Sequence, residues 1–305
     1  MTYLRLAAHL FLLLLWTRLW VKPEREFYFN PFLSGATRLM DSVVGFLRPA
    51  LMLPDRLTAL VLLLLFWVFQ TIFFAQFGGT WNLSLGLIHF TPPSESLAWG
   101  MQFAYSGLHS AHVLLQMWTL YFFVRLITPP NRTTRAQEAF TFFMNPFSRL
   151  PLLAQPVVLL ALHFALLVVV IRIGAIPFAV EDIVRKEAKA IPELFTGGHI
   201  LVQVLKTGWL TMLSFTNGLQ TLIWTLIFFL LGGMAMMLFG ANLPTIICRE
   251  SVDVLLGRFA RNPTSVGGFD FTPMFFVIVV SLLSGQLQAT LYSLILMPMP
   301  GPLSP

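Results

Sequence analysis

Charged residues are scarce in this sequence. Only 10% of its 305 residues are Asp, Glu, Lys or Arg, 57% are hydrophobic, and the mean hydropathy is +0.78. A soluble domain carries about 25% charged residues, so a chain this apolar cannot cover its surface in water. The expected solvent is therefore lipid.

Cysteine and the common catalytic motifs are scarce as well. Cys248 is the single cysteine, which excludes an internal disulfide and any site built from several cysteines. The HExxH, GxSxG, GxxxxGK[ST] and GxGxxG patterns do not occur. These absences predict a protein that is not an enzyme, with no catalytic residues and no metal site.

Long apolar stretches are the main feature that is present. A membrane-spanning helix needs about 20 mostly apolar residues. The stretches that approach or reach this length are Leu6–Val21, Leu57–Phe77, Leu108–Ile127, Leu152–Ile171, Gly218–Gly240 and Pro273–Leu296. The expected fold class is therefore all-α: a polytopic membrane protein with about six transmembrane helices and amphipathic interfacial helices, in a single membrane domain covering residues 1–305.

A weaker apolar piece, His199–Phe215, contains Lys206 and Gly208 and ends next to Asn217-Gly218. We expect it to be interfacial or re-entrant. It belongs to an extra non-cytoplasmic segment at residues 178–217.

Basic residues are concentrated in three of the loops between the predicted spans. They are Lys22, Arg25, Arg38, Arg48 and Arg56, then Arg132, Arg135 and Arg149, then Arg249, Arg258 and Arg261. Loops rich in Lys and Arg stay in the cytoplasm. The sequence therefore predicts a multi-pass protein of the bacterial inner membrane, with these loops cytoplasmic and both termini on the other side. Nucleic acid is not an expected partner, because no basic block interleaved with aromatic residues occurs.

Two of the basic loops have the periodicity of amphipathic helices. In Phe32–Arg48 and in Arg249–Arg261, apolar residues share one helical face and polar residues the other. The polar faces comprise Ser34, Arg38, Asp41, Gly45 and Arg48 in the first, and Glu250, Asp253, Gly257 and Arg261 in the second. This pattern predicts helices in the membrane interface that contact the bilayer and its anionic headgroups.

The chain repeats a unit made of an apolar helix, a basic interfacial loop and a second apolar helix. The units cover about residues 1–80, 100–175 and 218–298. Asn30-Pro31-Phe32 in the first matches Asn145-Pro146-Phe147 in the second. Arg18 and Arg125 lie at equivalent helix ends, where a long side chain can reach lipid headgroups.

A glycine-rich turn, GGFDFTP, precedes the last predicted span. Gly267 and Gly268 permit a tight backbone turn. Asp270 or Thr272 can cap free N–H groups at the helix start, and Pro273 suits the first helical turn. We interpret this motif as an architectural joint and not as a catalytic site.

In the order of these features the chain resembles the YggT (also called YlmG) family of bacterial and plastid membrane proteins, as a divergent relative with three units instead of two. The likeness extends from Leu6 to about Phe77 and from Ile223 to about Leu296. The residues that correspond to the family pattern are Arg18, Asn30, Pro31, Asp41, Arg48, Asp253, Gly267, Gly268, Asp270 and Pro273. The resemblance implies a non-enzymatic accessory, assembly or scaffolding subunit of a membrane complex. The areas it implies are division or nucleoid organisation, cytochrome assembly, and osmotic or potassium tolerance.

Two alternatives to a scaffold remain open at this point. One is an ion or osmolyte channel or carrier, with a polar cavity around Thr216, Asn217 and Gln220 and helix breaks at Asn217-Gly218 or Gly232-Gly233. Gly232-Gly233 can equally be a point of close helix packing.

The other alternative is a haem-binding subunit. His109 and His112 share a helical face and His163 lies in the next span, and paired helix histidines can hold a b-type haem. Single polar residues in spans often only join helices. No other cofactor is expected.

Overall fold

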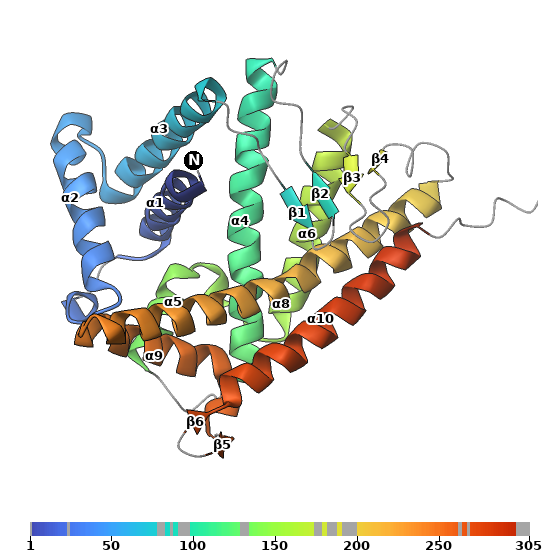
Figure 1. Cartoon of the computed structure of the whole chain (residues 1–305). Coiled ribbons are helices and arrows are strands. Elements are labelled where there is room, and N and C mark those ends of the chain that lie inside the picture. The colour runs from blue at the N-terminus through green and yellow to red at the C-terminus, as the bar shows by residue number, and fades with distance from the viewer. Residues whose placement is uncertain are drawn as a thin grey trace, which may run out of the picture.

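Helices make up most of the computed structural model. It describes residues 2–22, 25–77, 83–85, 88–90, 98–128, 134–173, 179–181, 188–190, 200–261, 264–266 and 269–296. Figure 1 shows α4 upright in the middle, with α1 and α3 on one side and the long pair α8 and α10 crossing diagonally. The long apolar helices are α1 (Thr2–Trp20), α3 (Asp55–Gln76), α4 (Trp99–Ile127), α6 (Ala154–Ile173), α8 (Ile200–Leu238) and α10 (Thr272–Leu296).

Shorter elements connect these helices. The shorter α-helices are α2 (Ser34–Leu51), α5 (Arg135–Phe143) and α9 (Asn242–Leu256), and the 3-10 helices are η1 (Arg25–Tyr28), η2 (Phe147–Arg149) and η3 (Phe259–Arg261). The antiparallel strand pairs are β1 (Leu83–Leu85) with β2 (Ile88–Phe90), β3 (Ala179–Glu181) with β4 (Ala188–Ala190), and β5 (Ser265–Val266) with β6 (Phe269–Asp270).

Four helices in the described part of the chain are long and apolar enough to cross a membrane. They are α3, α4, the Gln203–Leu238 part of α8 and the Thr272–Ile295 part of α10. The apolar parts of α1 and α6 are shorter, at Ala7–Trp20 and Ala154–Val170. Each of the six apolar stretches predicted from the sequence thus lies mostly within a helix, and four of these helices contain candidate spans.

Helix α4 is the centre of the packing. Its Tyr105 lies in a buried cluster with Phe74 of α3 and Leu213 of α8. Its Leu120 lies in another cluster, with Leu226 of α8 and Leu255 of α9. Helix α4 thus contributes residues to two separate buried clusters, one toward each of its ends.

The structure differs from the sequence prediction at the start of α4. The predicted span begins at Leu108, whereas the helix begins at Trp99. The added turns carry Gln102 and Ser106, which lower the hydropathy of this part. Both side chains are buried, and Ser106 is hydrogen bonded to Thr71 of α3 at 2.7 Å, so the helix hides these polar groups from lipid.

A second difference concerns α8. The sequence separates an interfacial or re-entrant piece, His199–Phe215, from a span beginning at Gly218, but a single helix runs from Ile200 through Gly218 to Leu238. A β-carbon on Gly218 would lie 2.5 Å from Cγ2 of Thr119. This glycine therefore permits close packing on α4, and no turn is formed there. Of the predicted extra segment, residues 178, 182–187 and 191–199 lie outside the described part.

Candidate functional site

The predicted interfacial loops meet at one end of the helix bundle. Leu33, directly before α2, and Met40, in the first half of α2, share a buried cluster with Ala139 and Phe142 of α5. Ala136, on the same short helix α5, joins a cluster with residues of α9. Figure 1 shows α5 and α9 together at the lower part of the molecule. We call this region, with the adjoining ends of α1 and α4, the linker junction.

We call the predicted interfacial loops linkers, and Asn30 connects the first linker, which contains α2, to the second, which contains α5. Its Nδ2 donates to the backbone oxygen of Arg135 at 3.0 Å, and its Oδ1 accepts from the backbone nitrogen of Phe32 at 3.0 Å. The side chain therefore fixes the turn before α2 and holds α5 against it. Pro31 lies within this turn.

Asn145, the matching residue of the second unit, ties the second linker to the first helix. Its backbone oxygen accepts from Nε1 of Trp16 at 3.2 Å. Its Oδ1 accepts from Nε of Arg149 at 2.9 Å, and Nη2 of Arg149 donates to the backbone oxygen of Trp20 at 3.2 Å. Pro146 follows directly. The two Asn-Pro motifs therefore hold the first two units together, each reaching into the other.

Arg18 lies at the centre of an ionic cluster at the end of α1. Its Nη2 is 3.1 Å from a carboxylate oxygen of Asp41 and 3.7 Å from one of Asp55. Arg48, which is largely exposed, pairs with Asp55 at 3.1 Å. The hydroxyl of Tyr28 donates to Asp41, and this hydrogen bond together with burial raises the pKa of the phenol. The cluster joins α1, α2 and α3.

The two arginines at equivalent helix ends both bind protein groups. Arg18 is 9% exposed and is engaged by the carboxylates above. Arg125 donates from Nη1 to the backbone oxygen of Leu150 at 2.9 Å, just after η2. Both side chains thus hold a linker to its preceding helix. Arg38, in contrast, is exposed on α2.

The end of α9 closes against the end of α4. Gly257 has a φ of +55°, and a β-carbon there would lie 2.6 Å from the backbone oxygen of Ile127. The backbone nitrogen of Arg258 donates to the same oxygen at 2.9 Å. Asp41 precedes Gly45 by four residues in α2, and Asp253 precedes Gly257 by four at the end of α9, but the two glycines differ in structure. Gly45 is a helical residue with open space around it, whereas Gly257 follows Asp253 where the helix stops.

The joint before α10 rests on Asp270. Its Oδ1 accepts from the backbone nitrogen of Thr272, the first residue of α10, at 2.9 Å, and Pro273 follows in the first turn. The hydroxyl of Thr272 accepts from the backbone nitrogen of Thr264 at 2.8 Å. Asp270 thus makes a hydrogen bond expected of a capping residue. Gly267, Gly268 and the side chain of Arg261 lie outside the described part of the structure.

A buried polar network joins α4, α6 and α8. Ser214 Oγ is 2.8 Å from Nδ1 of His163, and Thr119 Oγ1 is 3.0 Å from its Nε2. The hydroxyl proton of Thr119 goes to the backbone oxygen of Leu115 at 2.8 Å. Because a hydroxyl donates one proton, Nε2 of His163 must donate to Thr119, and Nδ1 accepts from Ser214.

The three candidate haem ligands are therefore held by other side chains. Both ring nitrogens of His163 are hydrogen bonded, and Nε2 of His112 accepts from Gln116 at 3.2 Å. Nε2 of His109 lies 3.1 Å from Nε2 of His9 on α1. An iron bound by His163 would require this residue to give up a hydrogen bond inside the bundle. The network fits the joining of helices better than axial ligation.

Sequence reasoning missed a row of buried polar residues along one face of α4, to which His112 belongs. The buried polar members of the row are Gln102, Ser106, His112, Gln116 and Thr119. Gln102 and Ser106 are four residues apart, and His112, Gln116 and Thr119 follow one another at spacings of four and three residues. Spacings of three or four residues are the signal that identifies one helical face. Hydropathy alone hides it, because apolar residues occupy the positions between.

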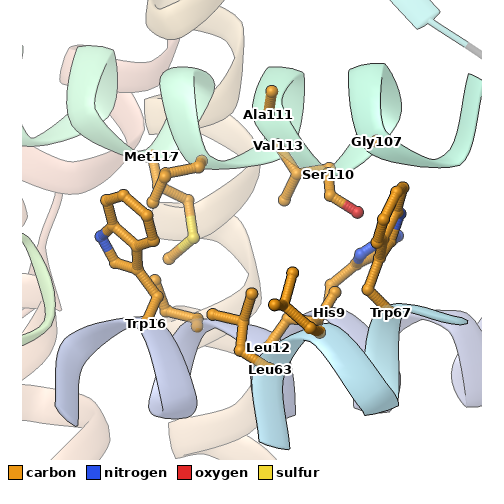
Figure 2. A pocket seen from close by; sticks show the side chains of 13 residues that line it. His9, Leu12, Trp16, Leu63, Trp67, Gly107, Ser110, Ala111, Val113 and Met117 are labelled. Atoms are coloured by element: carbon orange, nitrogen blue, oxygen red, sulfur yellow. The ribbon is translucent and has the colours of Figure 1, made fainter. Parts of the chain in front are cut away.

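A cavity of about 360 Å³ lies between α1, α3 and α4. Figure 2 shows His9, Trp67, Ser110 and Gly107 at one end, and Trp16 and Met117 at the other. The remaining lining residues are Leu12, Leu13, Leu63, Leu64, Ala111, Val113 and Leu114. The cavity is thus apolar along most of its length, with its polar side chains at one end.

Within the described ranges, no three His, Cys, Asp or Glu side chains are grouped so that they could hold a metal ion. Three other features could carry a function: the linker junction, the polar row of α4 and the cavity.

In comparisons with known proteins, no family model, no curated protein and no solved structure matches the chain.

Proposed function

We propose that this chain is a non-enzymatic, multi-pass membrane protein that acts by binding, as an accessory, assembly or scaffolding subunit of a membrane complex. In this proposal α1 and α6 join the four longer helices as spans. The linkers lie at the cytoplasmic leaflet of a bacterial inner membrane, with both termini on the opposite side. A distant relationship to the YggT family is part of the same proposal.

The observation that carries the proposal is the interlocked linker junction. The hydrogen bonds of Asn30, Asn145 and Arg258 each connect one linker to another unit or to the end of α4. The basic linkers are therefore held together at one end of the bundle, as the positive-inside rule requires for one leaflet. A rigid platform at the membrane surface suits docking better than catalysis.

Large apolar side chains are also exposed on the first linker, at the end of α2. Phe46 is 81% exposed and Met52 is 90% exposed, both at α2, beside the exposed Arg38 and Arg48. Apolar side chains next to basic ones suit a helix that lies in the headgroup region. They also provide the aromatic and Met contacts that are enriched where proteins meet.

Purification of the tagged chain from native membranes tests the proposal. We expect a stoichiometric membrane partner that is lost from a Phe46→Ser variant. The matched control is Leu153→Ser, which removes another large apolar side chain, 88% exposed, directly before α6. A chain that purifies alone under mild conditions contradicts the proposal.

A second candidate function, an ion or osmolyte channel or carrier, is favoured by the polar row of α4. From Gln102 to Thr119 the row covers about 26 Å of helix, close to the hydrocarbon thickness of about 30 Å. Polar residues inside membranes often mark ion pathways. The residues first expected to line such a path are otherwise engaged: Gln220 donates to Gln288 of α10 at 2.7 Å, and Thr216 to the backbone oxygen of Leu213.

Ion flux distinguishes the two candidates. If the purified chain conducts ions in liposomes, and the flux is reduced in Gln116→Leu, the result supports the channel or carrier. A chain that binds a partner and leaves liposomes tight supports the scaffold.

A further inference from the structure

The cavity between α1, α3 and α4 has the chemistry of a ligand site. Its volume of about 360 Å³ lies within the range of about 300–1,000 Å³ of small-molecule sites. Leu64 lines it and is 47% exposed, so the cavity opens at the outer surface of α3. In a protein surrounded by lipid, this opening admits molecules dissolved in the hydrocarbon.

The polar end of the cavity presents hydrogen-bond donors. The indole nitrogen of Trp67 is buried and has no partner among the described residues. The hydroxyl oxygen of Ser110 accepts from Nε2 of Gln70 at 3.3 Å, which leaves the hydroxyl proton of Ser110 to donate. Figure 2 places Trp67 and Ser110 at the same end, near His9. A carbonyl oxygen has two lone pairs and matches two such donors.

Depth in the membrane narrows the ligand class. Ser110 lies within about 5 Å of the midpoint of α4 along its axis, whereas the edge of the hydrocarbon lies about 15 Å from the bilayer centre. A phospholipid would have to draw its charged headgroup into hydrocarbon to place a carbonyl there, which is strongly unfavourable. An uncharged ring that bears carbonyls and an apolar tail meets no such cost.

We propose that this cavity binds a lipid-soluble quinone, with a ring carbonyl accepting from Trp67 and Ser110. The tail lies along Leu12, Leu63 and Val113 toward Trp16 and Met117. The proposal goes beyond the scaffolding function and stands independently of it. Trp16 is also the donor to Asn145, so the bound tail and the linker junction share one side chain.

Retention of decylubiquinone by the full chain in nanodiscs tests the proposal. We expect saturable retention above that of empty nanodiscs, at about one molecule per chain. Trp67→Phe and Ser110→Ala should each weaken binding about three- to tenfold, because each removes one hydrogen bond. Val113→Phe should abolish binding by filling the cavity.

The matched controls are Trp224→Phe, at a 70% exposed position of α8, and Ser293→Ala, at an exposed position of α10. Both should bind like the unaltered chain. Decane, which resembles the tail but lacks a carbonyl, should not displace the quinone from the unaltered protein. This competition uses only the unaltered protein, so its result does not depend on whether a variant folds.

Three outcomes overturn the proposal. Retention equal to that of empty nanodiscs means partition into lipid only. Displacement by decane at equal concentration means an apolar groove without carbonyl recognition. Equal affinity in Trp67→Phe, Ser110→Ala and the controls means that binding occurs elsewhere. A partner that co-purifies in each of these cases leaves the scaffolding proposal intact, so the two fail separately.

Discussion

Helices α10 and α5 distribute their side chains in opposite ways. Helix α10 exposes large apolar residues and buries Ser284 and Gln288 against the protein. Helix α5 buries Ala136, Ala139 and Phe142 and exposes Arg135 and Glu138. The apolar residues exposed on α10 are Met274, Phe275, Ile278, Val279, Leu282, Leu283 and Leu287.

The difference shows which solvent each helix is built for. Burying a polar group while exposing Leu and Phe is unfavourable in water and favourable in hydrocarbon. Gln288 avoids an unsatisfied carbonyl oxygen by accepting from Gln220 inside the α8–α10 pair. Helix α5 has the ordinary pattern of a helix that faces water or headgroups. The side chains of α10 therefore suit contact with hydrocarbon, and those of α5 suit contact with water or headgroups.

The largest effect is expected from a charge on the outer face of α10. Leu283 is 64% exposed and lies near the middle of the helix, where an arginine costs about 2.5–3.5 kcal/mol on insertion. Leu283→Arg should therefore reduce the fraction of chain that resists carbonate extraction from membranes. Glu138→Arg on α5, which keeps a charge at an exposed position, should change stability by less than about 1 kcal/mol. If both variants lost the same fraction of carbonate-resistant chain, the two helices would not differ in the solvent that they face.

The next largest effect is expected in the ionic cluster that joins α1, α2 and α3. Arg18→Leu leaves Asp41 and Asp55 without their shared partner, and we expect a loss of about 1–3 kcal/mol, because both carboxylates are partly exposed. Thermal unfolding in detergent measures it. Arg38→Leu on the exposed side of α2 is the control and should have little effect. An Arg18→Leu protein as stable as the control would show that the cluster does not hold α1 to α2.

A smaller effect is expected at the joint before α10. Asp270→Ala removes the hydrogen bond to Thr272 N and should cost about 0.5–2 kcal/mol, whereas Asp270→Asn keeps an acceptor and should cost less. Unfolding midpoints of the two variants, compared in one detergent, measure the difference. An Asn variant as unstable as the Ala variant would contradict the capping role.

The smallest effect is expected inside the bundle. Ser214→Ala removes one hydrogen bond of His163, and such bonds between membrane helices average about 0.6 kcal/mol. The control is Ser293→Ala, whose hydroxyl bonds only to its own helix. A large loss in Ser214→Ala, above about 2 kcal/mol, would mean that the buried polar network of α4, α6 and α8 holds the fold together and is not a replaceable set of contacts.

Sequence reasoning predicted the apolar helices well, because hydropathy over about 20 residues is a strong signal. It placed the start of α4 too late, since Gln102 and Ser106 lower the local hydropathy although they face the bundle interior. It also divided α8 at Gly218. Glycine signals a turn or a close approach equally, and only the contact with Thr119 shows which applies.

The candidate site was predicted less completely. Asn30, Asn145 and Asp270 stood out because their motifs have local chemistry, but the partners of the two asparagines, Arg135 and Trp16, are far apart in sequence. Long-range pairs of this kind leave no periodic pattern. The cavity at Trp67 could not be foreseen either, because it depends on how three helices pack around Gly107.

The side of the membrane reached by the linkers tests the central claim most directly. The chain has a single cysteine, so a Cys248→Ser background can carry one new cysteine at Arg38, Arg135 or Arg258, all exposed positions. In intact cells and in inverted membrane vesicles, a membrane-impermeant maleimide should label all three from the cytoplasmic side only. Labelling of any two of them from opposite sides would contradict a junction gathered at one leaflet.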